Sequence, residues 1–165
     1  MATGNDAGAL IGTWKQLSGT MVEEGSRISR SNLSAAPIGF VNFSRDGRLI
    51  LLSVDSARKK PAGEVPTAAE AEALYRSMIA YAGSYKVEGN KLTYDLDATW
   101  NESWTGTKQI RYWEISGDTL TITTPEIVNP LTGKRSVFRL TFSKVGPNSR
   151  QALGTAAGNL KKEEK

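Results

Sequence analysis

The chain contains no cysteine and no histidine in its 165 residues. Without thiols or imidazoles it cannot form disulfides, cysteine nucleophiles, Ser-His-Asp triads or zinc sites with Cys or His ligands. A metal would need an all-oxygen site, and the calcium-loop spacing of acidic residues does not occur. We therefore expect no cofactor and no metal. Carboxylates, lysine, arginine, tyrosine, hydroxyls and amides remain as the groups available for chemistry.

Long apolar runs and phosphate-binding loops are also missing from the sequence. No segment approaches the ~18 consecutive apolar residues that a transmembrane helix needs. The first residues carry neither the basic nor the apolar segment of a secretory signal. We therefore expect a cytoplasmic protein with no membrane partner. No strand pattern is followed by a glycine-rich phosphate loop or a Walker motif.

Net charge is modest, at +4, and the basic residues are spread along the chain, as at residues 58–60 and 161–162. A nucleic-acid protein usually concentrates such charge on one face, so the sequence predicts no nucleic-acid partner. The composition, 39% hydrophobic and 23% charged, is that of a globular domain. It leaves open whether the protein forms a homodimer.

Short runs of β-branched and apolar residues alternate with turn residues along most of the chain. The clearest turn is Asp46-Gly47, a hairpin signal because both residues tolerate positive φ. The cleanest alternation lies in residues 92–100, where Leu92 and Tyr94 share one face while Asp95 and Asp97 share the other. The eight predicted strands are 10–22, 38–43, 48–54, 84–87, 92–100, 107–115, 120–124 and 137–142.

One helix is predicted between the third and fourth strands, over residues 68–81. A capping box at Thr67 opens it, and five alanines within it favour helix. Leu74, Met78 and Tyr81 then form one apolar stripe. This stripe packs the helix on the rest of the domain or, alternatively, makes the helix a lid whose Met and Tyr face a ligand.

Eight strands joined to their sequence neighbours favour an all-β, antiparallel up-and-down barrel, because a closed barrel leaves no exposed sheet edge. Such a barrel has room for its own side chains and one small ligand. We expect residues 1–9 to be a flexible N-terminus, 10–145 to be the barrel domain and 146–165 to be a polar C-terminal tail.

Several motifs point to a known family. Leu-Ile-Gly-Thr-Trp at residues 10–14 is similar to the Gly-x-Trp motif of lipocalins and related calycins. Further motifs follow in order at residues 37–41, 46–48, 81–85, 104–113 and 117–120. Together they resemble the lipocalin-like domain family, small stand-alone bacterial proteins with calycin-type barrels, over about residues 9–145.

The resemblance implies a lipocalin-like barrel with a helix over or beside one end, and it implies small-molecule binding. It also implies that Trp14 fills the closed end of the barrel beneath a basic side chain, with Arg139 or Arg111 as the cover. The sequence lacks the disulfides of secreted lipocalins.

The strand at residues 107–115 carries the candidate anchor for a ligand. Trp113 and Ile115 indicate that its odd positions face inward, and Gln109 and Arg111 then face inward as well. A buried arginine needs a carboxylate, carbonyls, water or an anionic ligand, because desolvating its charge costs several kcal/mol. Three interpretations stay open: Arg111 anchors a ligand, Arg111 caps Trp14, or the even positions face inward instead.

Aromatic residues gather near this strand, as in small-molecule sites that combine apolar walls with few polar groups. Core packing is the alternative role for each of them. The predicted ligand-binding residues are Gln109, Arg111, Trp113, Tyr94, Trp100, Trp104, Tyr85 and Met78.

These residues predict a protein that binds a small hydrophobic or amphipathic molecule in its barrel cavity by a polar anchor. The alternative is a cofactor-independent cyclase, isomerase or dehydratase of a natural-product pathway, acting in the same cavity. Its candidate catalytic residues are Glu102, Tyr94 and Arg111. Glu102 is a candidate because it lies near Trp100 and Trp104 in the sequence.

Overall fold

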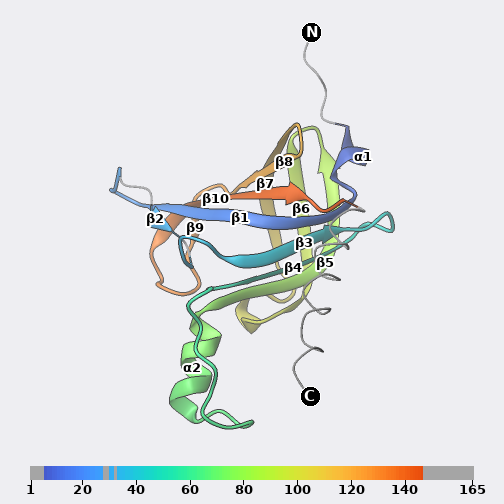
Figure 1. Cartoon of the computed structure of the whole chain (residues 1–165). Coiled ribbons are helices and arrows are strands. Elements are labelled where there is room, and N and C mark those ends of the chain that lie inside the picture. Colours follow the sequence, from blue (N-terminus) through green and yellow to red (C-terminus); the bar gives the residue numbers. More distant parts are fainter. Residues whose placement is uncertain (1–5, 28–29, 32, 147–165) are drawn as a thin grey trace, which may run out of the picture.

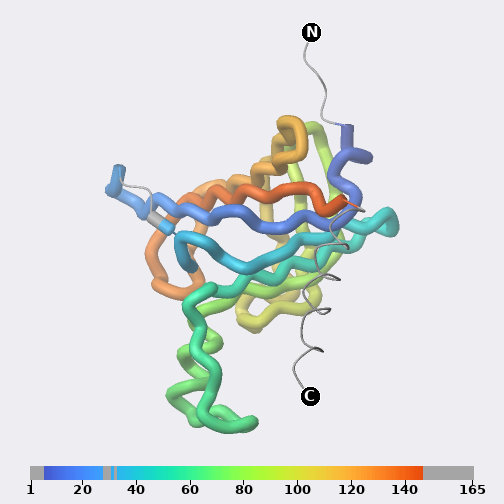
Figure 2. The backbone as a smooth tube through the Cα atoms, in the orientation of Figure 1, coloured from blue at the N-terminus to red at the C-terminus, as the bar shows by residue number. Residues whose placement is uncertain are grey.

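The computed structural model describes residues 6–27, 30–31 and 33–146. Most of the predicted flexible N-terminus and of the predicted polar tail, residues 1–5 and 147–165, lies outside the described residues. Figures 1 and 2 show strands wrapped around a common interior, with the short helix α1 (Ala7–Leu10) at one end of the barrel. The helix α2 (Ala68–Arg76) projects from the barrel wall.

Eight strands form the barrel in the order β1-β3-β4-β5-β6-β7-β8-β10, and β10 pairs with β1 to close the ring. All these pairings are antiparallel, so the predicted eight-stranded up-and-down barrel is confirmed. Two short strands, β2 (Arg30–Ser31) and β9 (Ile127–Val128), extend the sheet beside β1 and β10. The eight barrel strands are β1 (Gly12–Glu23), β3 (Ile38–Phe43), β4 (Arg48–Val54), β5 (Met78–Glu88), β6 (Lys91–Thr99), β7 (Lys108–Ser116), β8 (Thr119–Thr123) and β10 (Arg135–Lys144).

The core follows from the alternation of side chains along each strand. In β3, Val41 and Phe43 are buried while Ile38 and Phe40 face outward. The turn between β3 and β4 forms at Asp46-Gly47, as predicted. Gly47 has a φ of 81°, and the Asp46 carboxylate accepts a hydrogen bond of 3.1 Å from the backbone amide of Arg48. Alternation and turn chemistry together fix the register that points one apolar face of every strand inward.

Trp14 closes the barrel at the end where α1 lies. Its side chain is 2% exposed, and its indole N–H donates a hydrogen bond of 2.8 Å to the carbonyl of Leu10. The Nζ atom of Lys144 lies 4.3 Å from the indole ring centroid, within cation–π range. Lys144 also donates hydrogen bonds to the carbonyls of Ala9 and Ile11, and partial burial lowers its pKa.

The expectation that Arg139 or Arg111 covers Trp14 is therefore wrong. Lys144 takes that place because β1 and β10 pair in a register that sets Trp14 directly opposite Lys144. Arg139 is exposed and pairs with Glu114, at 3.3 Å. With Trp14 covered by lysine, Arg111 has another environment, described below.

The predicted helix over residues 68–81 is too long. The capping box at Thr67 is present, but α2 ends at Arg76, with Ser77 as its C-cap. Residues from Met78 onward pair with β4, with Tyr81 opposite Leu51, and their burial alternates from Ala80. The gain from sheet pairing and from burying Tyr81 overrides the helical tendency of this segment.

Because Met78 and Tyr81 belong to β5, the predicted helical stripe with Leu74 does not form. Neither the packing role nor the lid role proposed for that stripe holds. The helix α2 has no buried residue and stands away from the barrel (Figure 1). The ring of Tyr75, on α2, lies 6.4 Å from that of Trp100, which follows β6.

Strand β5 approaches β6 closely at Gly83, where the register of the pair shifts. A Cβ atom at this position would lie 2.2 Å from the carbonyl oxygen of Asp95. Only glycine fits this contact without moving the backbone, so the bulge depends on the missing side chain.

Candidate functional site

A cavity of about 40 Å³ lies inside the barrel, toward the end where β9 and the loop at residues 125–134 lie. Its volume is enough for about three water molecules at ~10–15 Å³ each. The buried hydrophobic core, which includes Trp14, Phe43 and Phe142, packs in the same barrel interior. The cavity is lined by Gln16, Leu51, Ser53, Ile79, Tyr81, Trp104, Arg111, Thr124, Ile127, Pro130, Phe138 and Leu140.

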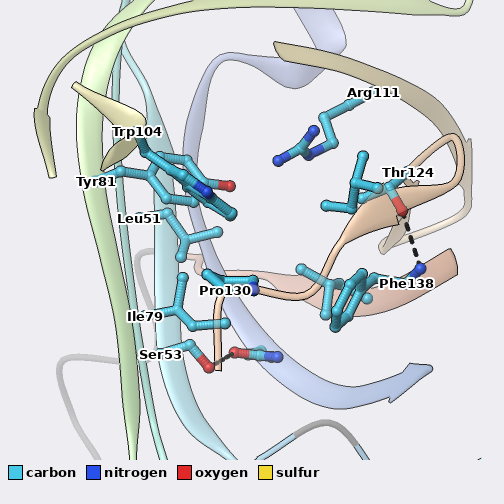
Figure 3. A pocket seen from close by; sticks show the side chains of 12 residues that line it. Leu51, Ser53, Ile79, Tyr81, Trp104, Arg111, Thr124, Pro130 and Phe138 are labelled. Atoms are coloured by element: carbon cyan, nitrogen blue, oxygen red, sulfur yellow. Dashed lines mark hydrogen bonds between the residues drawn. The ribbon is translucent and has the colours of Figure 1, made fainter. Parts of the chain in front are cut away.

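Arg111, on β7, is the one ionisable side chain among these lining residues apart from the phenol of Tyr81. It is 4% exposed, and Figure 3 shows its guanidinium directed into the space between Trp104 and Thr124. The guanidinium donates hydrogen bonds to the side-chain oxygen of Gln109, at 2.5 Å, and to the carbonyl of Ile110, at 2.7 Å. Both acceptors are neutral, so neither compensates the buried positive charge.

Within the described residues, no carboxylate forms an ion pair with Arg111. The nearby phenols do not supply a negative charge either. Burial raises the pKa of Tyr81, although Arg111 opposes that rise, and burial raises the pKa of Tyr94 well above its usual value. Both phenols are thus neutral at pH 7, and the guanidinium lies 5.6 Å from the ring centroid of Tyr94. The cavity is therefore a mainly apolar space with an uncompensated cation in its wall.

A second polar group faces the cavity on the side away from Arg111 (Figure 3). The Ser53 hydroxyl donates a hydrogen bond of 2.6 Å to the side-chain oxygen of Gln16, and both residues are buried. Gly39 makes room for this pair, because a Cβ atom there would lie 2.4 Å from the same Gln16 oxygen. Leu51, Ile79 and Tyr81 lie between the two polar groups in Figure 3.

Outside the barrel wall, a groove of about 410 Å³ runs along the first half of β7. It shares Trp104, Arg111 and Ile127 with the inner cavity, so Arg111 stands in the wall common to both spaces. We call this feature the β7 groove. Its lining residues are Trp104, Thr107, Lys108, Gln109, Ile110, Arg111, Pro125, Ile127 and Val128.

The β7 groove exists because β8 is shorter than β7 and pairs with only the second half of it. Their ladder runs from Tyr112, opposite Thr123, to Ser116, opposite Thr119. Residues 108–111 pair with β6 alone, because the chain leaves β8 before Pro125, which has no backbone N–H to donate. Beside Arg111 the barrel wall therefore has no sheet hydrogen bonds between β7 and β8, and side chains close it.

The predicted orientation of β7 is confirmed. Arg111 and Trp113 are buried, while Tyr112 and Glu114, at even positions, are exposed. Asp95 and Asp97 face outward as expected, and they bind Lys108 and Arg48 respectively. The interpretation that Arg111 caps Trp14 and the interpretation that the even positions face inward are both wrong.

The structure brings together some of the predicted ligand-binding residues. Trp104, on the turn η1 (Glu102–Trp104), and Arg111 line both the cavity and the β7 groove, and Gln109 lines the groove. Trp100 packs edge-on against Trp104, with ring centroids 5.2 Å apart. Tyr94 lies behind Arg111 in the core.

The other predicted residues lie apart from the cavity. Trp113 is buried in the core, and its indole N–H donates a hydrogen bond to the carbonyl of Gly89. The Tyr85 hydroxyl donates to the carbonyl of Ser44. Met78 does not line the cavity, and strand alternation puts it on the face opposite Ile79. Glu102 is exposed and accepts a hydrogen bond from Thr105.

Sequence reasoning missed several lining residues. The polar residue Ser53 on the inward face of β4, next to Leu51, is a signal that alternation alone could have revealed. Ile127, on the two-residue strand β9, and Pro130, on the loop that follows, could not have been found in this way, because this segment is too short and irregular to show a period.

Residues 6–27, 30–31 and 33–146 contain no group of three or more acidic side chains placed to hold a metal ion. None of the helices described is long and apolar enough to cross a membrane.

Comparison with known proteins places this barrel in a family. The family model described as a lipocalin-like domain matches residues 11–145, so the chain belongs to the lipocalin-like domain family. No curated protein matches the chain. Among solved structures, it is similar to an uncharacterized protein from Bacteroides eggerthii DSM 20697, with 13% identity and a TM-score of 0.37. That match covers 79% of this chain and 98% of the other.

Proposed function

We propose that the protein binds a small, largely hydrophobic molecule whose polar end reaches the barrel cavity, where Arg111 and Gln109 hold it. One observation carries the proposal: a guanidinium that is 4% exposed faces a mainly apolar cavity and has no carboxylate partner among the described residues. A buried charge left uncompensated is costly, and proteins keep such groups where a ligand completes them. Membership of the lipocalin-like family supports small-molecule binding in general.

Catalysis receives no comparable support from the geometry. Glu102 is exposed and does not line the cavity, and Tyr94 lies behind Arg111 in the core. Of the three candidate catalytic residues, Arg111 alone reaches the space where a ligand would lie. An acid–base group beside the ligand, which cyclases and isomerases of this kind need, is not provided by the residues we predicted.

A substitution that fills the cavity tests the proposal. Leu140→Trp, on β10, replaces a lining side chain with a larger one that overfills the space, whereas Val137→Trp adds the same side chain at an exposed position of the same strand. We expect Leu140→Trp to weaken binding of an apolar fluorescent dye at least about tenfold and Val137→Trp to leave it unchanged. Dye titrations would measure this, with circular dichroism as a check on folding.

Native mass spectrometry of freshly purified protein provides a second test, without a dye. We expect adducts with members of a library of small apolar compounds, and their loss in Leu140→Trp. A wild-type protein that binds neither the dye nor any library member would contradict the proposal. Equal binding by the two tryptophan variants would show that the ligand occupies some other place.

A further inference from the structure

We infer that the ligand is a monocarboxylate with an apolar tail, whose head lies on Arg111 and whose tail follows the β7 groove. The inference rests on the proposed function and adds to it the charge of the ligand, its orientation and its route of entry. Three features of the structure carry it: the charge balance of the cavity, its volume, and the opening of the sheet beside β7.

The charge balance of the cavity favours an anion as the ligand. Apart from Arg111, the lining residues of the cavity are uncharged, and burial keeps Tyr81 and Tyr94 in their neutral forms. The hydrogen bonds of the guanidinium to Gln109 and Ile110 orient it without neutralising it. A carboxylate matches the planar fork of the guanidinium and forms stronger, charge-assisted hydrogen bonds than a neutral group can.

The volume and the single cation favour a carboxylate over a phosphate or sulfate. A space of about 40 Å³ accepts a planar group of three heavy atoms more readily than a tetrahedral one. A doubly charged phosphate would need a second cation. Lys108, at the rim of the groove, is already bound to Asp95.

The tail cannot continue deeper into the barrel. Beyond Arg111 the cavity ends at Gln16 and Ser53, whose polar groups satisfy each other. The β7 groove offers the alternative, because it begins at the same guanidinium and provides about ten times the volume. Its wall includes Pro125, Ile127 and Val128, and the side chain of Val128 is 55% exposed.

The missing β7–β8 pairing explains how a ligand would reach Arg111. The ladder between these strands stops at Tyr112 and Thr123, so the wall beside residues 108–111 is closed by side chains and not by sheet hydrogen bonds. A ligand can enter sideways there by moving side chains such as Trp104 and Ile127. Entry along the barrel axis would require the loop at residues 125–134 to move.

Matched acids and esters test the inference. We would titrate the full chain with octanoate and 3-phenylpropionate and with their methyl esters, and follow tryptophan fluorescence and calorimetric heat. The acids should bind about ten- to hundredfold more tightly than the esters, the ratio expected for charge-assisted hydrogen bonds. Arg111→Gln should remove this preference, whereas Arg139→Gln, at an exposed arginine of β10, should keep it.

A second variant keeps the inference testable if Arg111→Gln does not fold. Ile127→Asp puts a carboxylate in the wall shared by the cavity and the β7 groove, and it should abolish acid binding while ester binding persists. Equal affinity for acids and esters in the wild-type protein would overturn the inference and leave the proposed function standing. Failure of acids, esters and the apolar library alike would overturn both.

Discussion

Replacing Trp14 with alanine is expected to lower the free energy of unfolding by about 3–5 kcal/mol, the usual cost of removing a fully buried aromatic side chain. The indole fills the closed end of the barrel, and the substitution also removes its hydrogen bond to Leu10. It leaves the ammonium of Lys144 without the ring beneath it. Urea titration monitored by circular dichroism would measure the change.

Trp100→Ala is the matched control for this prediction. Trp100 is only partly buried, its indole N–H finds no hydrogen-bond partner among the described residues, and it packs against Tyr75 and Trp104 near the barrel surface. We expect its replacement to cost about 1–2 kcal/mol, in the ordinary range for single substitutions. Comparable losses for the two variants would argue against Trp14 as the residue that closes the barrel.

Gly83→Ala is expected to destabilise the protein by at least about 3 kcal/mol or to prevent folding, because overpacking against backbone cannot be relieved by a rotamer change. The new methyl group would lie 2.2 Å from the carbonyl oxygen of Asp95 and 2.9 Å from the Cα atom of Leu96. Both atoms belong to β6, so β5 and β6 would have to separate at the bulge. Thermal and urea denaturation of the soluble fraction would measure the loss.

Gly63→Ala is the control here, since a Cβ atom at Gly63 would meet nothing within 4 Å and its φ is not positive. We expect this variant to unfold within about 0.5 kcal/mol of the wild-type protein. If Gly83→Ala retained wild-type stability, the close approach of β5 to β6 could not be as the structure describes it.

The strands of the barrel could be predicted because most of them bury one face, and the two-residue period then appears in the sequence. The beginning of β5 could not, because alanines and a stripe including Met78 mimic a helix there, and pairing with β4 decides the outcome. The inward direction of Arg111 followed from Trp113 and Ile115 on the same strand. Local periodicity was enough for Arg111, whereas at Met78 it predicted the wrong element.

Features that join distant parts of the chain escaped prediction. Lys144 covers Trp14 because β1 and β10 pair in one particular register, and the sequence carries no local sign of that register. The contact of Gln16 with Ser53 has no local sign either, because the two residues lie on β1 and β4, which are not neighbours in the sheet. The loop that brings Ile127 and Pro130 to the cavity depends on turns without a repeating pattern.

The short ladder between β7 and β8 has a consequence for the motions of the protein. Residues 108–111 of β7 pair with β6 alone and have no sheet partner on the side of β8, whereas β3 and β4 each pair with a strand on both sides. The barrel wall should therefore open locally and transiently between β7 and β8. Such an opening would widen the interior without global unfolding. In deuterium-exchange experiments, amides at residues 108–112 should exchange faster than those of β3 and β4. A saturating concentration of ligand should slow the exchange of these amides.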